Sequence, residues 1–113
     1  MKLIASLRKE FNTNLFIPGA KQGVNVELNK AIHLRDFILM GELVAYDALH
    51  REESCGGHFR EEHQTEEGEA KRDDENFFYV GCWEYKGETT APELIKEKLE
   101  YEAIKVQTRN YKN

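Results

Sequence analysis

Two cysteines and two histidines are the residues of this chain whose types best suit metal binding. Cys55, His58 and His63 lie close together in the sequence, whereas Cys82 lies well downstream. Thiolates and imidazoles are the ligands of tetrahedral zinc sites, but a structural zinc site takes its ligands in pairs on tight turns. Cys82 has no second ligand beside it. The spacing therefore favours two reduced thiols with solvated or capping histidines, and a small zinc-binding protein stays open as an alternative.

Two other groups of residues could carry chemistry. Cys55 and His58 could form a reactive thiolate–imidazolium pair, although cysteine hydrolases bring the base from far along the chain. Asp73, Asp74 and Glu75 could bind a divalent cation, but they lack the alternating oxygen ligands and the glycine of a calcium loop, which favours a solvated acidic turn. We therefore assign no catalytic, cofactor-binding or metal-binding residue.

A pair of glycines follows a predicted helix instead of preceding one. That order is wrong for binding a phosphate at a helix N-terminus. We expect Gly56 to take a left-handed conformation that closes the long helix, with His50 and Arg51 suited to its negative end.

The elements that position these residues are mostly helical. Residues 1–15 carry apolar side chains at helical spacing but begin without a capping residue, which predicts the end of a truncated helix. Residues 25–53 predict a long helix capped by Asn25 and apolar around most of its circumference, so that it needs neighbours on more than one side. We predict a mainly α fold, a truncated three-helix-bundle-like arrangement of up-and-down helices followed by an extended or β C-terminal tail.

The second half of the chain predicts a loop and extended structure. Residues 54–76 are acidic and glycine-containing and predict an irregular loop, long enough to be functional or to lie against another surface. Residues 77–113 predict the extended tail, with a strand over 77–85 where aromatic residues alternate. Residues 92–101 fit either an extended partner or a helix.

Composition sets further limits. The 113 residues, with a mass of 13.2 kDa, allow one domain, 1–113. The 16 basic and 21 acidic residues give a net charge of −5, and charges of both signs are interleaved along the chain. This pattern argues against a nucleic-acid partner. Two cysteines are too few for the disulfide framework of a small secreted protein. This cysteine count favours a reducing, cytoplasmic setting. No signal peptide is visible and the longest apolar stretch is interrupted, so we expect a soluble chain without direct membrane insertion.

Two segments resemble a known pair of signatures. Residues 51–61 read Arg-Glu-Glu-Ser-Cys-Gly-Gly-His-Phe-Arg-Glu, and residues 72–77 read Arg-Asp-Asp-Glu-Asn-Phe. They resemble the C-terminal region of the succinate dehydrogenase and fumarate reductase flavoprotein subunit. That family carries an Arg-Glu-Ser-Arg-Gly-Ala-His type motif at the end of a long helix and an Arg-Asp-Asp-Glu-Asn-Trp type motif opening a strand. Residues 104–111 resemble its Ile-Lys-x-x-x-Arg-x-Tyr tail. The resemblance covers residues 25–113 and the trailing part of an earlier bundle helix before them. It departs where Cys55 replaces a common arginine, Gly57 an alanine and Phe77 a tryptophan.

The resemblance implies that the chemistry lies elsewhere in a parent subunit. That subunit would carry FAD and interconvert succinate and fumarate in an electron-transport respiratory complex, peripheral at the cytoplasmic face of the inner membrane. Aspartate oxidase shares the pattern, so the flavin class is implied more directly than the dicarboxylate. The family's flavin and substrate residues lie upstream, so we expect this fragment to hold no cofactor and to be inactive alone.

The resemblance also implies the partners of this domain. It would pack on the flavin domain of the same parent chain and near the iron–sulfur subunit. Arg51, His58, Arg60 and Arg72 are the predicted interdomain contacts, with ordinary surface charges as the alternative. An autonomous helical protein-interaction module, whose apolar face binds a partner helix, is the main rival function.

Overall fold

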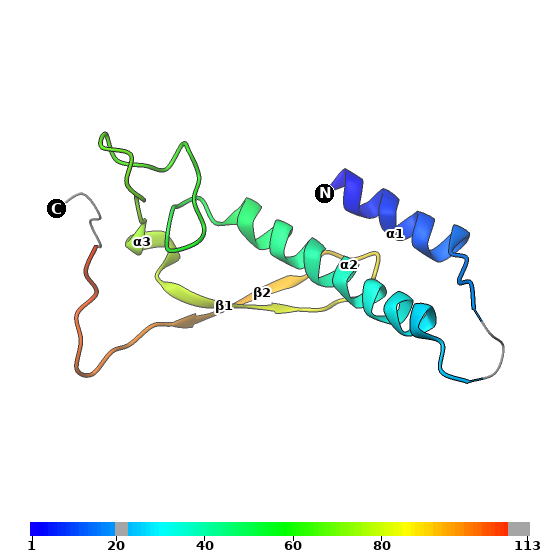
Figure 1. Ribbon diagram of the computed structural model, residues 1–113. Helices are drawn as coiled ribbons and strands as arrows, with labels where there is room; N and C mark the ends of the chain where they lie inside the picture. The colour runs from blue at the N-terminus through cyan, green and yellow to red at the C-terminus, as the bar shows by residue number, and fades with distance from the viewer. Residues whose placement is uncertain (20–22, 109–113) are drawn as a thin grey trace. The chain divides into compact units, whose positions relative to one another are not determined.

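The computed structural model describes residues 1–19 and 23–108 (Figure 1). Over these residues it has three helices and two strands, in the order α1 Lys2–Asn14, α2 Val26–His50, α3 Asp74–Phe77, β1 Tyr79–Glu84 and β2 Glu93–Lys98. The chain divides into a helical unit, Met1–His50, and a loop–hairpin unit, Arg51–Asn113. The predicted mainly helical fold with a β tail is confirmed.

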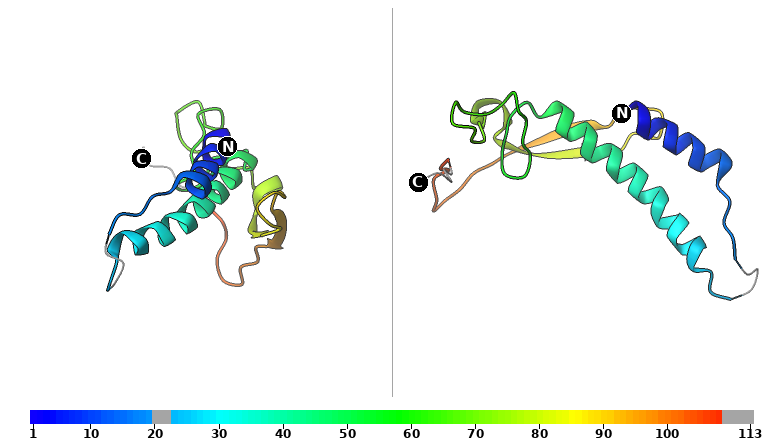
Figure 2. Two further views of the ribbon diagram at one scale, coloured as in Figure 1. Left: turned by 90° about the vertical axis from the view of Figure 1, so that its right-hand side faces the viewer. Right: turned by 45° about the horizontal axis from the view of Figure 1, so that its top comes forward.

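In the helical unit, α1 lies alongside α2 and runs in the opposite direction (Figures 1 and 2). The half-buried residues of α1 are Ile4, Arg8 and Phe11, which share one helical face. Arg8 forms an ion pair with Glu42 of α2. Ala31 is the buried hydrophobic residue of the described chain, so α1 covers one stripe of α2 and leaves much apolar surface exposed.

Each end of α2 carries a local side-chain hydrogen bond. Asn25 caps the start as predicted, because its Oδ1 accepts from the backbone N–H of Leu28 at 3.1 Å. At the other end the helix stops at His50, before the predicted residue 53. The Nδ1 atom of His50 lies 2.8 Å from the carbonyl oxygen of Tyr46, one of the carbonyls that a helix end leaves without a backbone partner. That α1 is the end of a longer helix stays a prediction.

Gly56 does not close α2, and that prediction was wrong. Its φ of 57° is left-handed, as expected, but it lies beyond the helix in the turn between Cys55 and His58. Cys55 and His58 exchange both backbone hydrogen bonds, at 2.8 and 3.1 Å, so Gly56 and Gly57 form a two-residue hairpin loop. Such a loop requires a positive φ at its first residue, which glycine supplies without strain.

The loop–hairpin unit ends in an antiparallel pair of strands. The register runs from Tyr79 opposite Lys98 to Glu84 opposite Glu93, so residues 93–98 form a strand and the helical alternative for 92–101 is wrong. The predicted strand is present, but it begins at Tyr79. Phe77 instead ends the short helix α3.

Side chains alternate along β1 as the sequence predicts, half-buried at odd positions and exposed at even ones. Trp83 lies opposite Leu94. A methyl group at Gly81 would lie 3.1 Å from the Leu94 Cδ1 atom, so the leucine packs where Gly81 leaves space. Residues 99–108 follow β2 without helix or strand. The last part of the predicted 104–111 signature, residues 109–111, lies outside the described residues.

Candidate interdomain contact site

A buried ion pair organises the start of the acidic loop. Arg51 Nη1 donates to Glu53 Oε1 at 2.7 Å and to the carbonyl oxygen of Phe77 at 3.2 Å. Glu53 is only 3% exposed, and its Oε2 accepts from the backbone N–H of Asp73 at 3.0 Å. The Arg51 guanidinium carbon also lies 5.8 Å from the ring centre of Phe77 and 5.2 Å from that of Tyr79. A buried carboxylate is costly unless it is paired in this way, so this pair fixes the loop to the start of the hairpin.

Ser54 is the most deeply buried residue of the loop, with an exposure of 0%. Its backbone N–H donates to the carbonyl oxygen of Lys71 at 2.9 Å. Its Oγ accepts from the backbone N–H of Arg60 at 2.8 Å and lies 3.2 Å from the Arg60 carbonyl oxygen, to which it donates. All polar groups of this side chain are therefore satisfied inside the loop, as a buried hydroxyl requires. Sequence reasoning listed Ser54 as part of the motif but assigned it no role.

The carbonyl oxygen of Arg51 gathers two of the predicted contact residues. His58 Nε2 lies 2.9 Å from it and Arg60 Nη1 lies 3.3 Å from it. Because a carbonyl oxygen can only accept, the Nε2 atom of His58 carries the proton. The structure thus brings Arg51, His58 and Arg60 together, and it does so through contacts within the loop.

Arg60 has a second partner on its own side of the loop. Its Nε and Nη2 atoms lie 2.7 and 2.6 Å from Glu62 Oε1. The pKa of the Glu62 carboxyl lies below its ordinary value because its own backbone N–H and the Arg60 side chain donate hydrogen bonds to it. The Arg60 side chain keeps 22% of its surface exposed. It therefore makes hydrogen bonds within the loop while part of its surface faces solvent.

Arg72 makes its contacts with a different part of the unit. It pairs with the carboxylate of Asp74, and its Nη1 donates to the carbonyl oxygen of Gln107 at 3.5 Å. Its Nε atom is buried and has no hydrogen-bond partner among the described residues. Among the four predicted contact residues, Arg72 is the one with a buried donor that lacks a partner within the described chain.

The acidic residues after Arg72 are not a freely solvated turn. Asp73 caps α3, with Oδ1 accepting from the Asn76 backbone N–H at 3.1 Å and Oδ2 from the Asn76 side-chain amide at 2.8 Å. These hydrogen bonds, the side-chain one first, hold the pKa of the Asp73 carboxyl below its ordinary value. With Asp74 paired to Arg72, the carboxylates serve helix capping and ion pairing.

The residues considered for zinc or for nucleophilic catalysis lie in the loop and on strand β1. Cys55 is exposed beside the Gly56–Gly57 turn, and Cys82 is exposed on β1. His58 uses Nε2 on the Arg51 carbonyl. Over residues 1–19 and 23–108, no three cysteine, histidine or acidic side chains gather in a way that could hold a metal ion.

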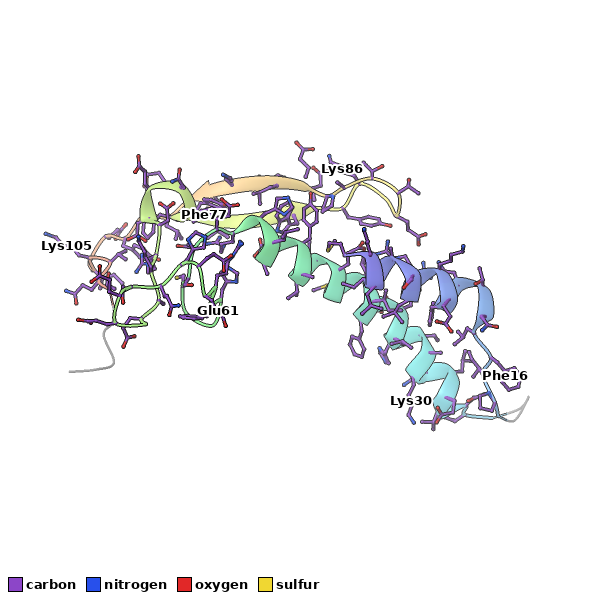
Figure 3. The ribbon with its side chains drawn as sticks, turned by 90° about the horizontal axis from the view of Figure 1, so that it is seen from above. Phe16, Lys30, Glu61, Phe77, Lys86 and Lys105 are labelled. Atoms are coloured by element: carbon purple, nitrogen blue, oxygen red, sulfur yellow. The ribbon has the colours of Figure 1, made fainter. Side chains whose placement is uncertain are left out.

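The helical unit offers a second kind of surface. An open groove of about 500 Å³ lies between the segment that follows α1 and the first turns of α2. Its lining includes apolar side chains from both parts, among them Leu15, Phe16, Ile17, Pro18, Ala31, Leu34 and Phe37. Figure 3 shows Phe16 and Lys30 at this end of the unit. The broad apolar exposure that the sequence predicts is present, with Phe37 67% exposed.

Helices that leave apolar faces uncovered are typical of a surface that packs against another protein or domain. The chain belongs to the family described as fumarate reductase flavoprotein C-term, which matches residues 1–111 of its 113 residues. It is thus a C-terminal domain of the succinate dehydrogenase/fumarate reductase flavoprotein class, and the resemblance carried by the two motifs is confirmed. No curated protein and no solved structure gives a significant match. In the described part of the chain, no helix has both the length and the apolar character needed to cross a bilayer.

Proposed function

We propose that this domain packs on the FAD domain of its parent flavoprotein and beside the iron–sulfur subunit, and that it holds these parts in place. The parent interconverts succinate and fumarate through FAD and passes electrons within a respiratory complex at the cytoplasmic face of the inner membrane. The domain itself binds no cofactor and supplies no catalytic residue. The observation that carries the proposal is the exposed apolar surface of α2 in a chain of this flavoprotein family.

The exposed residues of α2 are too large and too numerous for an ordinary solvated helix. Those on its central turns include Ile32, Phe37, Leu39, Met40 and Val44, each between 43% and 67% exposed. Burying a side chain of this kind contributes on the order of 1.5 to 3 kcal/mol. A neighbour that covers this face gains more from burial than from any single surface ion pair, which contributes about 0 to 1 kcal/mol.

The loop cations would orient a neighbour through a contact of their own. Arg60 and Arg72 are each about one-fifth exposed while their buried edges are held within the unit. A guanidinium held in one place loses little further freedom when it meets a carboxylate on a neighbour. Arg51 and His58 support the proposal indirectly, because they shape the loop that presents Arg60.

Association with the flavin domain tests the proposal. The flavin domain encoded in the same genome is purified separately, and binding of the chain is measured by isothermal titration calorimetry. Replacing exposed apolar residues, Phe37→Ser with Met40→Ser, should weaken association at least tenfold, because it removes two large buried side chains from the contact. The matched control is Asp36→Ser on the same helix, which should leave binding within about twofold. A wild-type chain that shows no association with the flavin domain contradicts the proposal.

One observation supports a second candidate, an autonomous helical interaction module. The apolar groove of about 500 Å³ beside α2 has the lining expected for the apolar side of a partner helix. Tight binding of an amphipathic helical peptide, lost in the Phe37→Ser variant, combined with no binding to the flavin domain, would favour this module over the accessory domain.

A further inference from the structure

The chain beyond β2 forms a distinct segment. Residues 99–108, here called the C-terminal strap, leave the hairpin with no helix or strand over these described positions. Leu99 is half-buried, and the other residues of the strap are exposed. Figure 3 labels Lys105 on the strap. The strap is therefore ordered by a small number of contacts and not by a core of its own.

Two contacts join the strap to the two flanks of helix α3. The ring of Tyr101 lies 6.1 Å from that of Phe78, centre to centre, and Phe78 follows α3 directly. The carbonyl oxygen of Gln107 accepts from Arg72 Nη1 at 3.5 Å, and Arg72 lies just before the α3 cap. The strap thus bridges the beginning and the end of α3.

This attachment is weaker than the network beneath it. A donor–acceptor distance of 3.5 Å is at the long limit of a hydrogen bond, and Tyr101 remains 48% exposed despite its ring contact. By contrast, Glu53 and Ser54 are buried, and their side-chain oxygen atoms all have hydrogen-bond partners. Arg72 Nε is also buried without a partner among the described residues, a state that costs free energy and that water could relieve if the site opened.

We propose that the strap is a detachable element that opens as one piece from α3 while residues 51–98 stay folded. On opening, it uncovers the Arg72 guanidinium and the Phe78 ring. That these two groups then contact the flavin domain rests on the proposed function. The detachment itself follows from the strap's own contacts and is tested on the chain alone.

Brief digestion of the full 113-residue chain with trypsin measures the opening. Mass spectrometry follows cleavage after Lys105. Tyr101→Ala removes the ring contact from the strap side and should raise the rate of this cleavage about two- to tenfold, the range expected for one aromatic pair. Arg72→Gln, which removes the other attachment, should act in the same direction. The matched control Glu102→Ala changes an exposed residue of the strap and should cleave at the wild-type rate.

Two results would overturn the strap proposal. One is a Tyr101→Ala chain cut after Lys105 no faster than the wild type and the Glu102→Ala control. The other is a Tyr101→Ala chain whose urea unfolding midpoint falls along with faster cutting throughout residues 51–98, which would make the strap part of the cooperative core. Neither measurement involves the flavin domain, so a failure here is separate from a failure of the association experiment.

Discussion

The carboxylate of Glu53 lies 2.7 Å from Arg51 Nη1 and is almost completely removed from solvent, with an exposure of 3%. The second carboxylate oxygen accepts from the Asp73 backbone. One side chain therefore links the two sequence motifs of the chain, which are far apart in sequence.

Replacing Glu53 should have a large effect on the stability of the loop–hairpin unit. Glu53→Gln keeps the shape but leaves the Arg51 guanidinium without its charge partner, and we expect a loss of about 2 to 4 kcal/mol. Urea unfolding followed by Trp83 fluorescence measures it. Glu61→Gln, an exposed residue of the same loop, is the control and should change stability by less than about 0.5 kcal/mol. Equal stability of the two variants would show that the ion pair does not organise the loop.

The two glycines of the turn should respond differently to the same substitution. Gly56 has a φ of 57°, so Gly56→Ala should destabilise the unit by about 1 to 2 kcal/mol. Gly57 does not have a positive φ, and a methyl group there would meet nothing within 4 Å. Gly57→Ala should therefore be neutral within about 0.5 kcal/mol. Thermal unfolding of both variants tests the difference, and a larger loss at Gly57 would contradict the turn described above.

The closed end of the hairpin depends on one lysine. Glu84 and Glu93 are cross-strand partners of like charge, and Lys86 Nζ lies 2.8 and 3.0 Å from their carboxylates. Figure 3 shows Lys86 near the connection between the strands. Lys86→Met should loosen this end, because like charges directly opposite destabilise a strand pair. Amide exchange of residues 82–95 should become faster, whereas Lys98→Met, an exposed lysine at the open end, should leave it unchanged.

The same lysine gives the hairpin a pH dependence. Hydrogen bonds to Glu84, and then to Glu93, raise the pKa of Lys86 above 10.5. A raised pKa means that the stabilisation is complete below the unfolded-state value and is lost as the pH rises through the folded-state value. Hairpin amide exchange, corrected for its intrinsic pH dependence, should therefore increase above pH 10.5 in the wild type and not in Lys86→Met. If amide exchange at high pH increased no more in the wild type than in the variant, the proposed role of the Lys86 ion pairs would be contradicted.

Asp73 should give a pH dependence of the opposite sign. Its pKa lies below 3.8 because Asn76 donates to it from the side chain and the backbone. Its contribution is therefore present above pH 3.8 and is lost as the pH falls through the lower folded-state value. Asp73→Ala should lose the cap at all pH values. Asp73→Asn should retain the backbone cap without this pH dependence. Acid titration of amide signals in α3 by NMR separates the three cases.

Local patterns predicted much of the fold. Apolar spacing predicted α1 and α2, Asn25 predicted the start of α2, and aromatic alternation predicted β1. The end of α2 was misplaced because it depends on contacts with residues distant in sequence. Ser54 pairs with Lys71 and Glu53 with Asp73, and no helical or strand period signals such pairs.

The candidate site was predicted by residue type but not by role. Arg51 and His58 are charged or polar residues in a motif, and the sequence could not show that each is used within the loop. The structural role of Ser54 was not predicted, because a serine is usually exposed. Its burial here depends on hydrogen bonds with the backbone of two other residues, Arg60 and Lys71. The only available signal was its place between Glu53 and the Cys55–His58 turn.

The turn between Cys55 and His58 also leaves room for other side chains on the surface of the domain. Cys55 is exposed, and a methyl group at Gly57 would meet nothing within 4 Å, so both positions border open space. A different residue at either position would therefore alter the solvent-facing chemistry of the turn and leave the buried Glu53 and Ser54 in place.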